Sequence, residues 1–361
     1  MIDNLYEPNK AITNIRNKYK IQDLTLPLGL ITEALKYKAT DIHLKTDSKI
    51  YFRINGELIC MEDFPIMNRY DILNFAATLD SNTAISKTEI NERKTIDFSS
   101  FINIEQKNIY FRCNLYKTDN ENRYSLAVRI LQNKIPTFEE LNLPKNIKNL
   151  LNYTHGMILI SGAAGNGKTT TLASLIEAIN SMKNRHIITI EDPIEYRFVS
   201  RKSLIEQRQV GGDVNSFPEA LRASLREDPD IIVLGELRDK ETIRTAIWAA
   251  ESGHLVLATV HAADAVETID KIVQYFPNEQ EIIRYNLANS LKAVVSQELH
   301  PMKNNKDKKI CICDFLFTTP AVRTHIRNNE LHYIRNDMHM TSGMILREEA
   351  IKAYRKRQLI D

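Results

Sequence analysis

Residues 157–176 read MILISGAAGNGKTTTLASLI, and this stretch decides the expected fold. The apolar run Met157–Ile160 predicts a buried strand, and Thr171–Ala178 has the composition of a helix. Between them, Gly162–Thr169 fits the pattern G-x-x-x-x-G-K-[ST]. In this pattern glycines let backbone N–H groups turn inward around phosphate oxygens, and the following helix adds its positive end. The stretch therefore predicts a nucleotide-binding phosphate loop.

Two side chains of the loop have roles in this pattern. Lys168 is expected to reach the β- and γ-phosphates, and the Thr169 hydroxyl is expected to coordinate Mg²⁺. The expected ligands are therefore ATP and Mg²⁺. The residues expected to bind the nucleotide are Gly162, Ala164, Gly165, Asn166, Gly167, Lys168, Thr169 and Thr170.

More apolar runs follow the loop and alternate with helix-like segments: His186–Ile190, Ile231–Leu234 and Leu255–Val260. Continuous apolar strands separated by helices indicate a parallel sheet that is covered on both faces. We therefore expect an α/β fold for this part of the chain, with Lys303–Lys309 as an exposed loop.

The part before Pro136 has a different composition. Lys49–Ile54 and Asn108–Cys113 alternate like half-buried strands, and the pair Asn55-Gly56 predicts a hairpin turn. Tyr70–Leu79 has apolar residues at helical spacing. The expected divisions are a leader at 1–26, an α+β domain at 27–133, a linker at 134–145 and the α/β domain at 146–361.

Composition and charge exclude several classes of protein. With 43% hydrophobic and 26% charged residues among 361, the chain is not disordered or fibrous, and we expect a soluble protein. The 48 basic and 46 acidic residues nearly cancel, so no global field draws nucleic acid to it. No apolar run reaches 18 residues, so no transmembrane segment is expected. The four scattered cysteines and the absence of an apolar leader fit a reducing cytoplasm.

Two acidic segments follow expected strands, and the carboxyl ends of parallel strands face one crevice. The first ends in Glu195, after Glu191-Asp192, and the second contains Gly235-Glu236. Gly235 stands where many phosphate-loop enzymes have a Mg²⁺-holding Asp. Glu236 is therefore expected to be the carboxylate that acts on Mg²⁺ or on the attacking water. Glu195 is the other candidate for polarising that water. A solvated acidic turn is the alternative for both segments.

Two histidines flank the fourth expected strand. His254 and His261 lack the i, i+4 spacing of a metal-binding helix and have no neighbouring cysteine cluster, so we do not expect a metal there. A hydrogen bond from either histidine to the γ-phosphate is favoured, with a structural role as the alternative.

The sequence resembles the type II/type IV secretion ATPase family. The phosphate loop, the two acidic segments and the segment with the two histidines follow one another in the order of that family's Walker A, Asp, Walker B and His boxes. The resemblance implies a PAS-like N-terminal domain and a RecA-like ATPase domain with C-terminal helices. It also implies a homohexamer beneath an inner-membrane pilus or secretion platform. By this resemblance, Glu195 would act as the catalytic base and Glu236 would act on magnesium and water. His254 and His261 would act as phosphate sensors. The N-domain arginines that would reach the nucleotide are Arg112, Arg123 and Arg129.

Within that family, Pro320–His332 resembles the C-terminal segment of the pilus retraction ATPases. Extension ATPases usually have four clustered zinc-binding cysteines, whereas this region has only Cys311 and Cys313, which we interpret as structural strand residues. We therefore expect a cytoplasmic ATP-hydrolysing motor for pilus retraction. The alternatives are a related secretion, conjugation or pilus-assembly ATPase, or a RecA-like nucleic-acid motor. Direct nucleic-acid binding is not expected, because no stripe of interleaved aromatic and basic residues is visible in the sequence.

Overall fold

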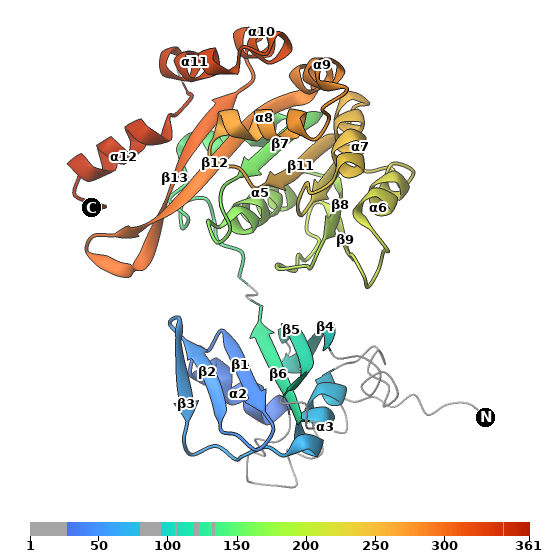
Figure 1. The fold of residues 1–361 in the computed structure, drawn as a ribbon, viewed down its shortest axis with the longest axis vertical. Helices are drawn as coiled ribbons and strands as arrows, with labels where there is room; N and C mark the ends of the chain where they lie inside the picture. Colours follow the sequence, from blue (N-terminus) through green and yellow to red (C-terminus); the bar gives the residue numbers. More distant parts are fainter. Residues whose placement is uncertain (1–26, 80–94, 105–106, 119–122, 132–133, 342) are drawn as a thin grey trace. The chain divides into compact units, whose positions relative to one another are not determined.

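The computed structural model describes residues 27–79, 95–104, 107–118, 123–131, 134–341 and 343–361. The chain divides into two compact units, at 1–133 and 134–361, and each is described by itself (Figure 1). The predicted leader at 1–26 lies outside the described residues.

In the residues that the structure describes, the first unit is a six-stranded antiparallel sheet with two helices, α2 (Pro27–Lys36) and α3 (Arg69–Leu79). The strands, in spatial order, are β3 (Glu57–Met61), β2 (Ile50–Ile54), β1 (Asp41–Lys45), β6 (Arg123–Ile130), β5 (Lys107–Thr118) and β4 (Thr95–Ile104). The predicted hairpin is confirmed: Ile54 pairs with Glu57, and Asn55 and Gly56 both have positive φ, at 51° and 87°. A turn of this kind matches the twist of the two strands.

The second unit is built on a seven-stranded sheet. Its strands, in spatial order, are β13 (Asn305–Phe317), β12 (Leu291–Met302), β7 (Gly156–Ser161), β11 (Leu255–Val260), β10 (Ile231–Leu234), β8 (His186–Glu191) and β9 (Leu204–Gln209). All neighbours are parallel except β12 and β13. The four central strands predicted from apolar runs are confirmed.

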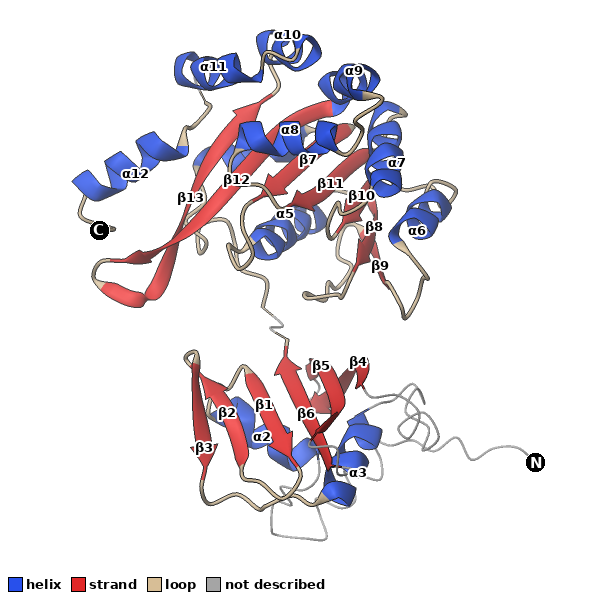
Figure 2. Ribbon diagram, in the orientation of Figure 1, coloured by secondary structure: helices blue, strands red, loops and turns tan. Residues whose placement is uncertain are grey.

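Helices cover both faces of this sheet (Figure 2). Along β7, Met157 and Leu159 face one core while Ile158 and Ile160 face the other, because successive strand residues point to opposite sides. The first core is closed by α6 (Phe217–Ser224), α7 (Lys240–Glu251), α8 (Ala265–Gln274), α9 (Gln280–Ser290), α10 (Pro320–Asn328) and α11 (Ile334–Met340). The second is closed by α5 (Lys168–Met182) and the 3₁₀ helix η1 (Lys145–Asn152).

Two segments differ from their predicted form. Phe138 and Leu143, in the stretch predicted to be a linker, are buried in the second core with α5, so their apolar side chains belong to this unit. The prediction of a loop at Lys303–Lys309 is wrong: apart from a tight turn, these residues extend the β12–β13 hairpin. Its lysines made the segment look like a loop, but charged residues are common on exposed strand edges.

Cys311 and Cys313 lie buried in β13, as the structural interpretation predicted, and burial raises the pKa of the Cys311 thiol to about 12. The C-terminal region continues through the 3₁₀ helix η2 (Leu331–Tyr333) to α12 (Arg347–Lys356). Among the described residues, no helix is both long and apolar enough to cross a membrane. The α/β fold class is confirmed, whereas the PAS-like identity of the first unit stays a prediction.

Candidate nucleotide site

The phosphate loop joins the end of β7 to the start of α5. Gly167 precedes the first helical residue, Lys168, with φ of 76°, and Gly165 has φ of 78°. Both angles lie in the left-handed region that side chains disfavour, so glycine is required for the loop to curl. The amino end of the 15-residue helix α5 therefore opens into the loop, where its free N–H groups favour an anion.

Strand β12 holds the loop from one side. The Gln297 amide nitrogen donates to the Asn166 carbonyl over 2.6 Å, and the Leu299 N–H donates to the Asn166 side-chain oxygen over 3.3 Å. A Cβ at Gly162 would lie 2.4 Å from the Gln297 carbonyl oxygen. Gln297 is thus a supporting residue that the sequence interpretation missed, because it lies 131 positions beyond Asn166.

Lys168 lies across the loop. Its ammonium donates to the carbonyls of Gly162 and Ala163 over 2.9 and 3.0 Å, and only 8% of the residue is exposed. Burial lowers the pKa of Lys168, and the negative charges of Glu236 and Glu195 partly oppose that shift. The two predicted carboxylates therefore lie within electrostatic range of this lysine.

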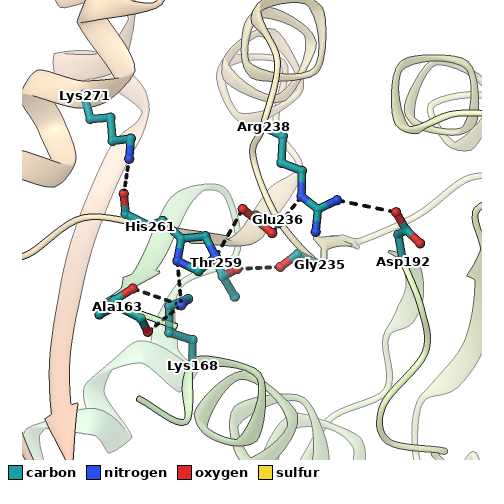
Figure 3. Close-up of polar contacts among 10 residues, drawn as sticks. Ala163, Lys168, Asp192, Gly235, Glu236, Arg238, Thr259, His261 and Lys271 are labelled. Atoms are coloured by element: carbon teal, nitrogen blue, oxygen red, sulfur yellow. Dashed lines mark hydrogen bonds and ion pairs between the residues drawn. The ribbon is translucent and has the colours of Figure 1, made fainter. Parts of the chain in front are cut away.

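His261 connects the lysine to Glu236 (Figure 3). The Lys168 ammonium lies 3.3 Å from His261 Nδ1, and His261 Nε2 lies 3.3 Å from Glu236 Oε1. Burial, followed by the charge of Lys168, lowers the pKa of His261, so its ring is neutral at pH 7. An ammonium can only donate, so Nδ1 accepts and the ring proton lies on Nε2, facing Glu236.

The other oxygen of Glu236 is held by Arg238, a residue to which the sequence interpretation gave no role. Arg238 Nε donates to Glu236 Oε2 over 2.8 Å, and its Nη1 lies 3.5 Å from Asp192 Oδ2. These contacts bring together residues that follow three neighbouring parallel strands: β8, β10 and β11. The closeness of Arg238 to Glu236 along the chain is the signal that could have identified it.

Glu191 and Glu195 have different environments. Glu191 is buried and accepts hydrogen bonds from the Thr189 hydroxyl over 2.6 Å, from Gln207 over 3.2 Å and from the Glu195 N–H. Burial raises the pKa of Glu191. The Glu195 side chain is exposed, and the next residue, Tyr196, bonds the Thr170 hydroxyl over 2.9 Å. Glu191 therefore supports the turn that carries Glu195.

Gly235 occupies a position where a side chain would be tightly packed. A Cβ there would lie 3.3 Å from Glu191 Cα and 3.4 Å from the Ile190 carbonyl oxygen, both backbone atoms of the adjacent strand. The Gly235 N–H donates to that carbonyl over 2.8 Å, and its own carbonyl accepts from the Thr259 hydroxyl over 2.5 Å. This packing gives a physical reason for glycine where other phosphate-loop enzymes have aspartate.

Gly235→Ala is expected to lower the free energy of unfolding by about 1–3 kcal/mol, because two strands must move apart. Chemical denaturation measures this change. Gly212→Ala is the matched control, since its nearest contacts would be 3.9 Å away, and it should be neutral or slightly stabilising. Equal stability of the two variants would contradict the steric explanation.

The fold separates the two predicted phosphate sensors. His261 follows the carboxyl end of β11, but His254 precedes its first residue, where its carbonyl accepts from Gly156 N–H at the start of β7. Six strand residues span roughly 20 Å. Within one chain His254 is therefore at the opposite edge of the sheet, and it is not part of the cluster around Lys168.

The three predicted arginines lie in the first unit. Arg112 and Arg129 are direct cross-strand partners on β5 and β6, whereas Arg123 pairs with Thr118 six residues away. Arg129 Nε donates to Asp41 over 2.8 Å. Arg112 is exposed, and its side chain has no hydrogen bond or ion pair among the described residues.

A glycine-rich loop at a helix amino end, a buried lysine and carboxylates at adjoining strand ends together define a phosphate-loop nucleotide-binding protein of the α/β class. The chain belongs to the Type II/IV secretion system protein family, whose model matches residues 21–358. The family predicted from the four motifs is confirmed.

Individual relatives extend this similarity. The type IV pilus retraction ATPase PilT of Pseudomonas aeruginosa is 37% identical over 310 residues, which cover 84% of this chain and 85% of that protein. The protein YggR of Escherichia coli, which is uncharacterised, is 45% identical over 211 residues, 58% of this chain and 64% of that protein. The crystal structure of the pilus retraction motor PilT with bound ADP superposes with a TM-score of 0.80 at 38% identity, covering 92% of this chain and 97% of the other.

Proposed function

We propose that this chain is an ATP-hydrolysing motor that powers type IV pilus retraction. The observation that carries the proposal is the continuous contact path from Lys168 through His261 to Glu236. This path links the phosphate loop, which follows β7, to the carboxylate that follows β10, across the end of β11 between them. The similarity to PilT, a retraction motor solved with ADP, extends over most of both chains and supports the same nucleotide and the same task.

ATP and Mg²⁺ suit the donors present. Helix α5 and the loop N–H groups would hold the phosphates, and the Thr169 hydroxyl with Glu236 would supply oxygen ligands of the kind that Mg²⁺ prefers. Glu195 would polarise the attacking water. The neutral His261 would donate a hydrogen bond from Nε2 to the γ-phosphate instead of to Glu236.

A motor of this kind would work as a homohexamer on the cytoplasmic face of the inner membrane, held there by a platform protein. Arginines from the first unit would contact phosphates bound by the second, so that hydrolysis changes the contacts between units. We propose no direct nucleic-acid partner, since the net charge of the chain is only +2.

The test follows labelled surface pili in cells that lack the gene, restored with the parent or with Lys168→Ala. We expect pili to accumulate without shortening events in the deletion strain, and only the parent to restore shortening. Lys168→Ala removes the ammonium that the loop carbonyls hold, so nucleotide binding is lost. Lys183→Ala, which removes a lysine at the far end of α5, is the matched control and should restore shortening.

Other outcomes distinguish the related machines. Loss of surface pili would assign the chain to pilus assembly. Unchanged pili would assign it to a secretion system, which the family description names, or to a conjugation system. Either result would overturn the retraction proposal.

A further inference from the structure

A basic cluster lies at the edge of the second sheet opposite the phosphate loop. It consists of Lys292 at the start of β12, Arg323 and Arg327 on α10, and His155 just before β7. β7 and β12 run parallel from this edge, with Leu291 opposite Met157. The strand length of β7 therefore places roughly 20 Å between the cluster and the nucleotide site.

Lys292 is held in place by the backbone beneath it. Gly156 has φ of 99°, and a Cβ there would lie 2.3 Å from Lys292 Cε and 2.7 Å from its Cγ. The lysine stem therefore crosses a residue that has no side chain. Its ammonium lies 3.4 Å from His155 Nε2. Burial lowers the pKa of Lys292, and the positive charge of Arg323 lowers it further.

The cluster continues along α10, which packs against α9 (Figure 1). Arg323 and Arg327 are four residues apart and share a helix face. The Arg327 guanidinium lies 5.1 Å from the centre of the Tyr285 ring and donates to the Asn289 side chain. Tyr285 is 56% exposed. The surface is therefore a row of cations that ends at a tyrosine.

The cluster lacks carboxylate partners. None of the ion pairs in the described part of the chain includes Lys292, Arg323, Arg327 or His155. Elsewhere in this unit Arg244, by contrast, forms a two-pronged contact with Glu279 over 2.7 and 2.8 Å. Like charges that are held together without a counter-ion favour binding of an anionic group.

We propose that this basic cluster is a docking site for an acidic segment of a partner protein. A peptide suits the cluster better than a nucleic acid. Arg327 covers one face of the Tyr285 ring, so less of the ring is free to stack on a base. Two or three carboxylates along an extended segment can pair with successive guanidinium groups, as Arg favours two-pronged contacts with carboxylates. The site is separate from the proposed ATPase chemistry.

The experiment titrates the full-length protein with a fluorescent hexaglutamate peptide and follows anisotropy at low salt. We expect saturable binding, at least about tenfold weaker for the double variant Lys292→Gln/Arg323→Gln and weaker at 200 mM salt, since exposed charges are screened. Lys356→Gln, on α12, removes one charge elsewhere and should bind within about twofold of the parent.

ATP turnover and thermal unfolding of each variant serve as checks, and both should match the parent. Equal peptide affinity of the double variant and the parent would overturn the proposal. So would tighter binding of a hexathymidine oligonucleotide than of the peptide, which would indicate a nucleic-acid site. Competition by millimolar inorganic phosphate that abolishes peptide binding would indicate a small-anion site and would also overturn it.

Discussion

Glu236→Gln is expected to lower the rate of ATP turnover by about 10²–10⁴-fold, the range typical for loss of a catalytic acid or base. Glutamine has the same shape, so Arg238 can still donate to its oxygen over the present 2.8 Å. The negative charge that we propose to act on Mg²⁺ and on the attacking water is lost. Steady-state phosphate release measures the rate.

Nucleotide affinity should change much less than turnover, because Lys168 keeps its loop contacts. Binding of a fluorescent ADP analogue tests this point. Glu251→Gln is the matched control: it makes the same chemical change at the exposed end of α7, next to the sheet edge that carries His254, and should leave turnover within about twofold. If Glu236→Gln released phosphate at the rate of the parent, this carboxylate would have no part in the proposed chemistry.

Local patterns predicted most of the fold. The strand β7, the loop and helix α5 follow one another in sequence, so the apolar period and the glycines contain all the information needed to place them. The Asn55-Gly56 hairpin is local in the same way. The burial of Phe138 and Leu143 was missed because prolines on both sides suggested a linker, whereas burial depends on a core formed by distant strands.

The candidate site depends on contacts across strands, which are harder to predict. Sequence position groups His254 with His261, but a strand of six residues puts its two ends at opposite edges of the sheet. Gln297 supports the phosphate loop through a register between β12 and β7 that no local pattern encodes. The basic cluster was missed for the same reason, because Gly156 and Lys292 are adjacent only after folding.

Arg112→Ala is the second substitution for which we expect a large loss, about 10³–10⁵-fold in ATP turnover, the range measured for removal of an arginine that stabilises a transferring phosphoryl group. Three N-domain arginines are proposed to reach the nucleotide. Among them, Arg112 has an exposed side chain that forms no hydrogen bond or ion pair with any described residue. Arg129 is already held by Asp41 over 2.8 Å, so its guanidinium is partly committed within its own sheet.

The matched control is Arg123→Ala, the same substitution on the neighbouring strand, six residues along β6 from Arg129. That distance of roughly 20 Å prevents Arg123 and Arg112 from contacting the same phosphate group, so only one of the two variants should lose turnover to this extent. Phosphate release at saturating ATP gives the comparison, and size-exclusion chromatography shows whether either variant changes assembly. If Arg112→Ala turns over like the parent while Arg123→Ala fails, the other end of the sheet faces the nucleotide. If both variants keep full turnover, neither arginine reaches it.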